Sequence, residues 1–238
     1  MSNLTQIGTV GALRNDYKLV VYDLDGTLLE TLEDLAEAIT CAFQARGHRK
    51  VELGQVREAI GDGARSLIQR LLPAGCDGSE LDLTLELFRQ AYLDTCCVRS
   101  SWLAGAQRFL QARQQELPGR VQAILTNKPQ APTDRLVAHL GMDRWISRAI
   151  GGDTSLGKKP DPQGLRELMR WAGVEQGEVL MIGDGPADLQ VALAAGVDAV
   201  LLVEGYGQSH ELEGLPALLR VGGLEELDRL WPGTESAT

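Results

Sequence analysis

The chain has 238 residues and a formal net charge of −10 at pH 7, with 24% charged and 44% hydrophobic residues. This composition is typical of a folded protein with one large or two modest domains, and it excludes a disordered chain. The negative charge disfavours nucleic acids and anionic membrane surfaces as partners.

Other classes are disfavoured by what the sequence lacks. No segment approaches the ~18 apolar residues of a membrane span, and residues 1–18 lack the apolar core of a signal peptide. We therefore expect a cytoplasmic protein. The four cysteines show no C-x-x-C spacing, and the three histidines are scattered along the chain. These patterns disfavour a zinc site and a Ser-His-Asp triad.

The first predicted strand covers residues 18–22 (KLVVY), a short apolar run. It stops at the polar turn Asp23-Leu24-Asp25-Gly26-Thr27. Apolar residues then recur at helical spacing from about residue 32, and Gly47 is a plausible end for this helix. The chain thus opens with strand, polar loop and helix.

The pattern stays helical between about residues 50 and 100, and no convincing strand interrupts it. Residues 31–100 are therefore predicted to form a helical insertion, placed just after the first strand. Residues 1–30 and 101–238 are predicted to form the core domain, with weakly patterned residues at 1–16 and a frayed tail at 233–238.

Strands and helices alternate in the second half of the chain. The predicted strands are residues 121–125, 148–151, 179–182 and 199–203, and the helices are 132–140, 161–171 and 187–195. This alternation implies right-handed βαβ units. The fold class is therefore α/β, with a Rossmann-like parallel sheet covered by helices on both faces.

Several predicted strands end in polar residues, and ligands bind beyond the carboxyl ends of such strands. These segments are Asp23–Thr27, Thr126–Lys128 and Gly183–Asp188, together with the loop Lys158-Lys159-Pro160. The fold would bring all four segments to the same edge of the sheet.

Four of these side chains are carboxylates, and together they repel one another. They are Asp23, Asp25, Asp184 and Asp188. Each close pair costs about 4 kcal/mol at an effective dielectric near 20. A divalent cation with oxygen ligands, most economically Mg²⁺, neutralises them and suits a phosphate substrate.

Polar donors near the carboxylates can hold a phosphoryl group. Lys159, or its neighbour Lys158, supplies a positive charge. Thr126, Asn127 and the amides of the first turn can donate hydrogen bonds to phosphoryl oxygens. Thr126 and Asn127 could instead merely cap the following helix.

Asp23 and Asp25 are two residues apart, so the turn can aim both carboxylates at one point. An ionised carboxylate can attack phosphorus and form an aspartyl phosphate. A second carboxyl group can protonate the leaving alcohol and then activate water. The pair predicts that one carboxylate attacks and the other transfers protons.

In order and spacing, these segments resemble the four motifs of the haloacid dehalogenase superfamily of phosphohydrolases. The matching segments are Asp23–Leu28, Thr126–Lys128, Lys159-Pro160, and Gly183-Asp184 with Asp188. The resemblance implies that Asp23 is the nucleophile and Asp25 the acid/base, and that Thr126 and Lys159 hold the phosphate. A second carboxylate at position 25 looks like the phosphatase branch. The resemblance further implies that the insertion at residues 31–100 is the family's helical cap and that residues 1–30 and 101–238 form the catalytic core.

The resemblance also implies the metal ligands. Mg²⁺ would be bound by Asp23, the backbone carbonyl of Asp25, and Asp184. Asp188 would either bind the ion directly or orient the other ligands.

Residues 60–68 of the predicted cap are similar to a segment of phosphoglycolate phosphatases, as are residues 125–129 and 205–207. Gly61, Asp62, Gly63 and Arg65, together with Asn127, are therefore candidate substrate-binding residues. The glycines allow close approach to a small ligand, and Arg65 can pair with a substrate carboxylate. Alternatively, the cap segment is only a turn between two helices.

Taken together, the motifs predict a Mg²⁺-dependent phosphatase that hydrolyses a small phosphorylated metabolite through an aspartyl phosphate. The leading substrate is 2-phosphoglycolate. The alternatives are a phosphatase for a sugar phosphate, a nucleotide or pyrophosphate, a phosphomutase, and a non-enzymatic binding module. The sequence carries no signal for the oligomeric state.

Overall fold

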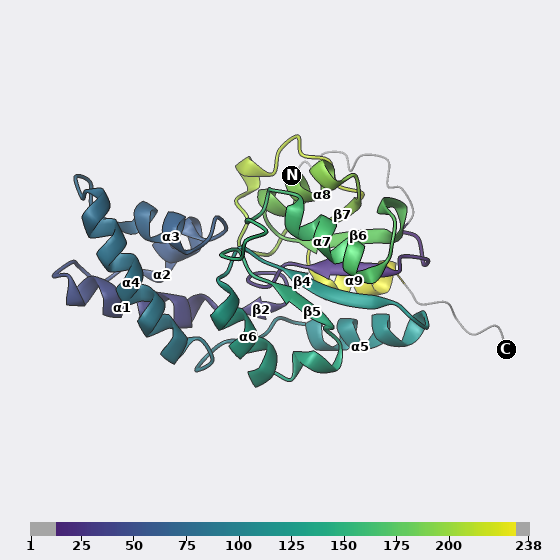
Figure 1. The fold of residues 1–238 in the computed structure, drawn as a ribbon, viewed down its shortest axis with the longest axis horizontal. Helices are drawn as coiled ribbons and strands as arrows, with labels where there is room; N and C mark the ends of the chain where they lie inside the picture. Colours follow the sequence, from purple (N-terminus) through teal and green to yellow (C-terminus); the bar gives the residue numbers. More distant parts are fainter. Residues whose placement is uncertain (1–12, 232–238) are drawn as a thin grey trace, which may run out of the picture.

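Six parallel strands form the centre of the molecule (Figure 1). In the computed structural model, which describes residues 13–231, their order is β5-β4-β1-β6-β7-β8. The strands are β1 (Leu19–Tyr22), β4 (Val121–Leu125), β5 (Arg148–Ile150), β6 (Val179–Gly183), β7 (Asp198–Leu202) and β8 (Leu219–Val221). The four central strands are almost wholly buried, as expected for a sheet covered on both faces. The predicted tail, and residues 1–12 of the predicted weakly patterned start, lie outside the described residues.

Helices cover both faces of this sheet (Figure 1). They are α5 (Ala106–Glu116), α6 (Gln130–His139), α7 (Gln163–Ala172), α8 (Pro186–Ala195) and α9 (Leu224–Leu230). One apolar core lies between one face of the sheet and helices α5, α6 and α9, which contribute Phe109, Leu136 and Leu227. Leu168 and Leu189 place α7 and α8 in a second core on the opposite face. The predicted Rossmann-like α/β fold is confirmed.

The two central strands lie where the chain changes its direction of travel across the sheet. From β1 it moves to β4 and β5 on one side, and from β6 it moves to β7 and β8 on the other. Ligands bind at such a switch point, beyond the carboxyl ends of the strands. Asp23 follows β1 and Asp184 follows β6, and the two strands are paired in register up to Tyr22 and Ile182. The topology therefore brings these two aspartates side by side.

Four of the five helices between β1 and β4 pack into a separate bundle, here called the helical cap (Figure 1). They are α1 (Leu32–Ala45), α2 (Leu53–Ala59), α3 (Ala64–Leu71) and α4 (Gly78–Thr95). Ile39 and Phe43 of α1 pack with Leu85 and Phe88 of α4 in the apolar core of the cap. A two-stranded antiparallel ribbon of β2 (Leu29–Glu30) and β3 (Ser101–Trp102) joins the cap to the sheet. The boundaries predicted after residues 30 and 100 fall at this ribbon.

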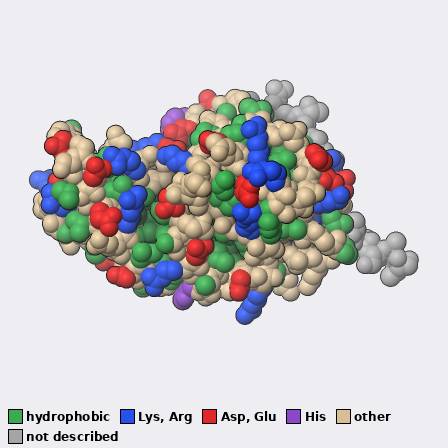
Figure 2. All heavy atoms as spheres, viewed as in Figure 1, with side chains coloured by type: hydrophobic (Ala, Val, Ile, Leu, Met, Phe, Trp, Pro, Cys, Tyr) green, Lys and Arg blue, Asp and Glu red, His purple; other side chains and the backbone are tan. Residues whose placement is uncertain are grey.

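Acidic and basic side chains are interspersed on the face that Figure 2 shows, over both the cap and the sheet unit. No helix within residues 13–231 has the length and apolar character needed to cross a bilayer.

Asp34, in the first turn of α1, is buried and holds one of the two connections between cap and sheet. Its carboxylate accepts hydrogen bonds from the Ser100 amide and hydroxyl at 2.8 and 2.7 Å, and from the Arg99 amide at 2.9 Å. Asp34→Ala leaves these donors without a partner. We expect urea titration to show a free energy of unfolding lower by about 2–4 kcal/mol.

Glu33→Ala is the matched control, because this exposed carboxylate forms only a 3.7 Å ion pair with Arg99. Its expected effect is below about 0.5 kcal/mol. Equal effects of the two substitutions would contradict the role given to Asp34.

Candidate active site

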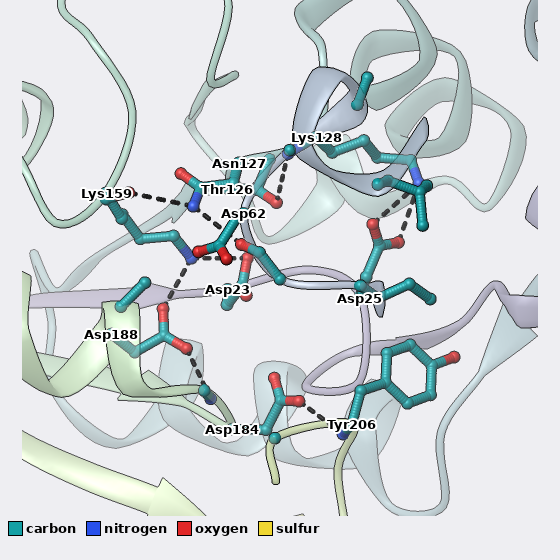
Figure 3. A pocket seen from close by; sticks show the side chains of 18 of the residues that line it. Asp23, Asp25, Asp62, Thr126, Asn127, Lys128, Lys159, Asp184, Asp188 and Tyr206 are labelled. Atoms are coloured by element: carbon teal, nitrogen blue, oxygen red, sulfur yellow. Dashed lines mark hydrogen bonds and ion pairs between the residues drawn. The ribbon is translucent and has the colours of Figure 1, made fainter. Parts of the chain in front are cut away.

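A cavity lies between the carboxyl ends of the central strands and the helical cap (Figure 3). Its polar end is lined by residues of the strand ends, among them Asp23, Asp25, Thr126, Asn127, Lys128, Lys159, Asp184 and Asp188. Its apolar end is lined by residues of the cap, among them Leu35, Ile60, Leu67, Phe88 and Tyr92. The fold thus brings the predicted strand-end residues together around one space.

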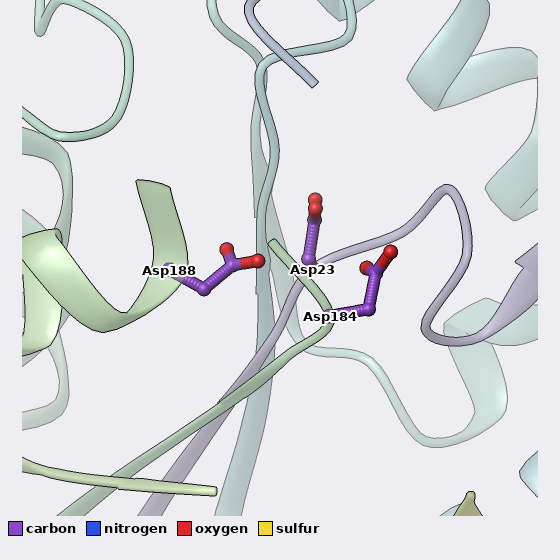
Figure 4. Close-up of side chains that lie close together, drawn as sticks. All are labelled: Asp23, Asp184 and Asp188. Carbon is purple, nitrogen blue, oxygen red and sulfur yellow. The ribbon is translucent and has the colours of Figure 1, made fainter. Parts of the chain in front are cut away.

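Three carboxylates converge at the polar end (Figure 4). One oxygen each from Asp23, Asp184 and Asp188 lie within 4.8 Å of one another. Hard oxygen donors at this spacing fit a divalent cation. The cluster is therefore compatible with the divalent metal that the sequence predicts.

Local hydrogen bonds orient two of these carboxylates. Asp184 accepts from the Thr27 hydroxyl and from the Tyr206 amide, both at 2.7 Å. Asp188, in the first turn of α8, accepts from the Gly185 amide at 3.0 Å. The two donors to Asp184 bind different oxygens, and the other oxygen of Asp188 faces the Lys159 ammonium.

Gly26 allows the first turn to pass close to Asp184. Its φ is +80°, in the left-handed region, and a Cβ at this position would lie 2.5 Å from Asp184 Oδ2. Any larger residue would meet both backbone strain and a clash, so the turn needs glycine here.

Lys159 supplies the positive charge of the cluster. Its buried ammonium lies 2.8 Å from Asp23 Oδ1 and 2.6 Å from Asp188 Oδ1. Burial alone would lower the pKa of Lys159, but Asp188 and Asp23 raise it above its usual value. Lys158, the alternative phosphate ligand, instead donates to the backbone carbonyl of Asp62 at 2.6 Å.

One lysine does not balance three acids. Burial raises the pKa of Asp23 to about 6; Lys159 opposes this shift, and Asp188 adds to it. Burial, with repulsion from Asp23 and Asp188, raises the pKa of Asp184 to about 7. Both carboxylates therefore favour either a proton or a cation at this site.

These raised pKa values predict pH-dependent cation binding. Protons compete for Asp23 and Asp184 below about pH 7, so we expect Mg²⁺ affinity to fall by at least ~30-fold between pH 8 and pH 5.5. The pKa values lie above that of an unfolded aspartate. The contribution of Asp23 and Asp184 to the stability of the metal-free protein should therefore fall as pH rises from about 4 to 7, and Mg²⁺ should restore it.

Titration calorimetry and thermal unfolding at several pH values test this expectation. Asp184→Asn should make the Mg²⁺ affinity vary less with pH between pH 6 and pH 8. Asp82→Asn, at an exposed side chain paired with Arg65, should keep the pH dependence of the wild type. A constant Mg²⁺ affinity from pH 5.5 to pH 8 would contradict the pKa assignment.

Asp25 lies apart from the three-carboxylate cluster, next to Lys128 (Figure 3). It accepts a hydrogen bond from the Thr31 hydroxyl at 2.7 Å, and both its oxygens lie 2.9 Å from the Lys128 ammonium. The two carboxylates of the first turn thus have different surroundings, as two separate chemical roles require.

Thr126 and Asn127 are both buried at the end of β4 and line the cavity. The Asn127 amide group donates to the carbonyls of Gly61, at 2.9 Å, and Lys159, at 3.1 Å. This contact ties the core to the cap turn. The Asn127 amide group therefore does not offer the free donor to phosphate that the sequence suggested, whereas Thr126 keeps that possibility.

The cap turn Gly61–Gly63 lines the cavity, as predicted, but Arg65 does not. Arg65 lies on the surface in a 2.6 Å ion pair with Asp82. Arg70, on the same helix, lines the cavity and forms an ion pair with Asp62. The predicted role of Arg65 in binding a substrate carboxylate therefore has no support in this geometry.

Sequence reasoning assigned no role to several residues of the site. Lys128 lies within a recognised motif but was given no contact. Tyr206 also has no role predicted from the sequence, although its amide donates to Asp184 and its hydroxyl accepts from the Thr31 amide at 3.0 Å. The glycines on either side of it were the available signal. Nothing in the sequence marked Tyr92, which meets Lys128 only in the folded chain.

The comparison with known families agrees with this site. A model described as haloacid dehalogenase-like hydrolase matches residues 20–202. The chain therefore belongs to the haloacid dehalogenase-like hydrolase family, which confirms the predicted resemblance and the enzyme class.

The relatives are more specific. A phosphoglycolate phosphatase of Pseudomonas fluorescens (strain Pf-5) is 35% identical over 222 residues, covering 91% of this chain and 79% of the relative. A phosphoglycolate phosphatase of Aliivibrio fischeri is 35% identical over 204 residues, covering 83% of this chain and 88% of the relative. Among solved structures, the crystal structure of a predicted phosphoglycolate phosphatase from Haemophilus somnus matches with a TM-score of 0.82 and 26% sequence identity. The match covers 90% of this chain and 98% of the other.

Proposed function

We propose that this protein is a Mg²⁺-dependent phosphatase that hydrolyses a small phosphorylated metabolite through an aspartyl phosphate, with 2-phosphoglycolate as the preferred substrate. The observation that carries the proposal is the placement of Asp23 within the three-carboxylate cluster, with Asp25 on the other side of the cavity. The relatives named phosphoglycolate phosphatase support the choice of substrate. A cytoplasmic location belongs to the same proposal, because charged metabolites do not cross membranes freely.

The cation would be held by Asp23, the backbone carbonyl of Asp25, and Asp184, with Asp188 binding it or orienting the others. When bound, Mg²⁺ neutralises charge on the phosphoryl oxygens and on the nucleophile. Lys159 and Thr126 then bind phosphoryl oxygens and hold phosphorus in line with Asp23. Gly61, Asp62 and Gly63 of the cap complete the lining of the substrate site, and Asn127 positions this turn through its hydrogen bond to the Gly61 carbonyl.

In the first step, a carboxylate oxygen of Asp23 forms a bond to phosphorus, and the bond from phosphorus to the ester oxygen breaks. Asp25 donates a proton to the ester oxygen, which leaves as an alcohol. In the second step, Asp25 removes a proton from water, whose oxygen attacks phosphorus and releases inorganic phosphate from Asp23.

The cap limits the size of the substrate and shields the reaction from water. The apolar cap residues, such as Leu67 and Phe88, form the end of the cavity opposite the phosphoryl site. A small leaving group fits between these residues and Asp25, and exclusion of water strengthens the electrostatic contacts with the phosphoryl group.

A kinetic screen over phosphate esters tests the proposal. We expect 2-phosphoglycolate to be hydrolysed with a kcat/KM at least ~10-fold above that of sugar phosphates, nucleotides, pyrophosphate and 4-nitrophenyl phosphate. EDTA should abolish the activity and Mg²⁺ should restore it. A higher value for another ester would contradict the substrate, an isomerised sugar phosphate would indicate a mutase, and no phosphate release at all would indicate a binding module.

A further inference from the structure

Lys128 is a buried cation on the side of the cavity where the leaving group would lie (Figure 3). Its side chain is 1% exposed. The ammonium lies 2.9 Å from both oxygens of Asp25, contacts the Tyr92 hydroxyl, and lies 4.6 Å from the centre of the Tyr92 ring. A buried ammonium is costly, so its presence in a substrate cavity calls for a role.

Among the described residues, three cations line the cavity: Arg70, Lys128 and Lys159. Lys159 is bound between Asp23 and Asp188 at the phosphoryl end. Arg70 is 44% exposed and paired with Asp62, so water screens its charge. Lys128 is therefore the cation best placed to meet a second negative charge on a substrate.

The contacts of Lys128 leave room for such a charge. An ammonium has three N–H donors, and Asp25 now faces it with both oxygens. The proposed proton transfer needs one Asp25 oxygen to face the ester oxygen instead. A substrate carboxylate can then take the released donor, while Asp25 and Tyr92 keep the other two.

We infer that Lys128 selects small phosphate esters that carry a carboxylate next to the ester carbon. The inference rests on the proposed function, because it places the ester oxygen beside Asp25. Since Lys128 is one hydrogen bond from Asp25, the carboxylate must lie within about two or three bonds of the ester oxygen. The phosphate ester of a 2-hydroxy acid meets this condition.

Lys128→Met tests the inference with two substrates that differ at one group: 2-phosphoglycolate and its amide, in which a neutral carboxamide replaces the carboxylate and the phosphate is kept. We expect wild-type kcat/KM to be about 100-fold higher for the acid. In the variant both rates fall, because Asp25 loses its partner, but the preference should shrink to within ~5-fold. Lys18→Met, at an exposed lysine paired with Glu178, should keep the wild-type preference.

A binding measurement separates recognition from chemistry. In an Asp23→Asn background, calorimetry should show that Lys128→Met weakens binding of 2-phosphoglycolate by about 100-fold and leaves binding of the amide within a few-fold. Thermal unfolding confirms that both variants are folded. This background keeps the measurement informative even where Lys128→Met has no measurable turnover.

Several results would overturn the inference alone: a wild-type enzyme that hydrolyses acid and amide equally well, a preference that survives in Lys128→Met, or equal losses of binding for both ligands. Each leaves the phosphatase activity intact. Wild-type protein that releases no phosphate from any ester would instead overturn the proposed function.

Discussion

Asp23→Asn is expected to abolish phosphate release, with kcat lower by at least ~10⁴-fold, because the amide cannot form the acyl phosphate. The substitution keeps the size of the side chain and its hydrogen bond from the Leu24 amide, so the fold should be retained. Phosphate release from 2-phosphoglycolate, measured with saturating Mg²⁺, checks the prediction.

The control for this measurement is Asp82→Asn, which changes an exposed carboxylate outside the cavity and should keep wild-type activity. Near-normal, EDTA-sensitive release by Asp23→Asn would exclude Asp23 as the nucleophile.

Asp25→Asn is expected to lower kcat for 2-phosphoglycolate by about 10³-fold, because an alkoxide leaves poorly without a proton donor. With 4-nitrophenyl phosphate the first step needs no acid, whereas the second still needs a base. Rapid mixing should therefore show a burst of about one nitrophenol per active site, followed by slow turnover.

The burst distinguishes an acid/base from a residue that only shapes the site. Equal losses for both esters, with no burst, would show that Asp25 acts on neither proton transfer. Asp82→Asn should again behave as wild type with both esters.

The sheet and its polar edge could be predicted from the sequence because their signals are local. Residues 19–22 and 179–183 are continuous apolar runs, which strands buried on both faces require. Each run stops at a polar turn. The parallel topology then brings Asp23 and Asp184 together across more than half of the chain, as the alternation of strands and helices had implied.

Other elements were not predicted because their patterns are weak or broken. α5 is rich in glutamine and arginine, and its inward side includes Arg113, which is buried and paired with Glu116 and Asp228. Strand β8 has only three residues, with Arg220 in the middle. Tertiary contacts, rather than local propensity, stabilise these segments.

The cap contacts could not be predicted residue by residue. Arg65 and Arg70 lie on one helix, and five residues turn a helix by about 140°, so the two arginines project on different sides. Which side meets the cavity depends on how the cap packs against the sheet. The meeting of Lys128 with Tyr92 likewise joins a strand end and a cap helix that are distant in the sequence.

The most direct test of the account is to trap the phosphorylated enzyme. Borohydride reduces an acyl phosphate of aspartate to homoserine, which peptide mass spectrometry locates. The enzyme is mixed with Mg²⁺ and 2-phosphoglycolate, the reaction is rapidly quenched, and borohydride is added. We expect homoserine at position 23, and none when EDTA replaces Mg²⁺. Homoserine at position 25 instead, or no homoserine anywhere during steady turnover, would contradict attack by Asp23.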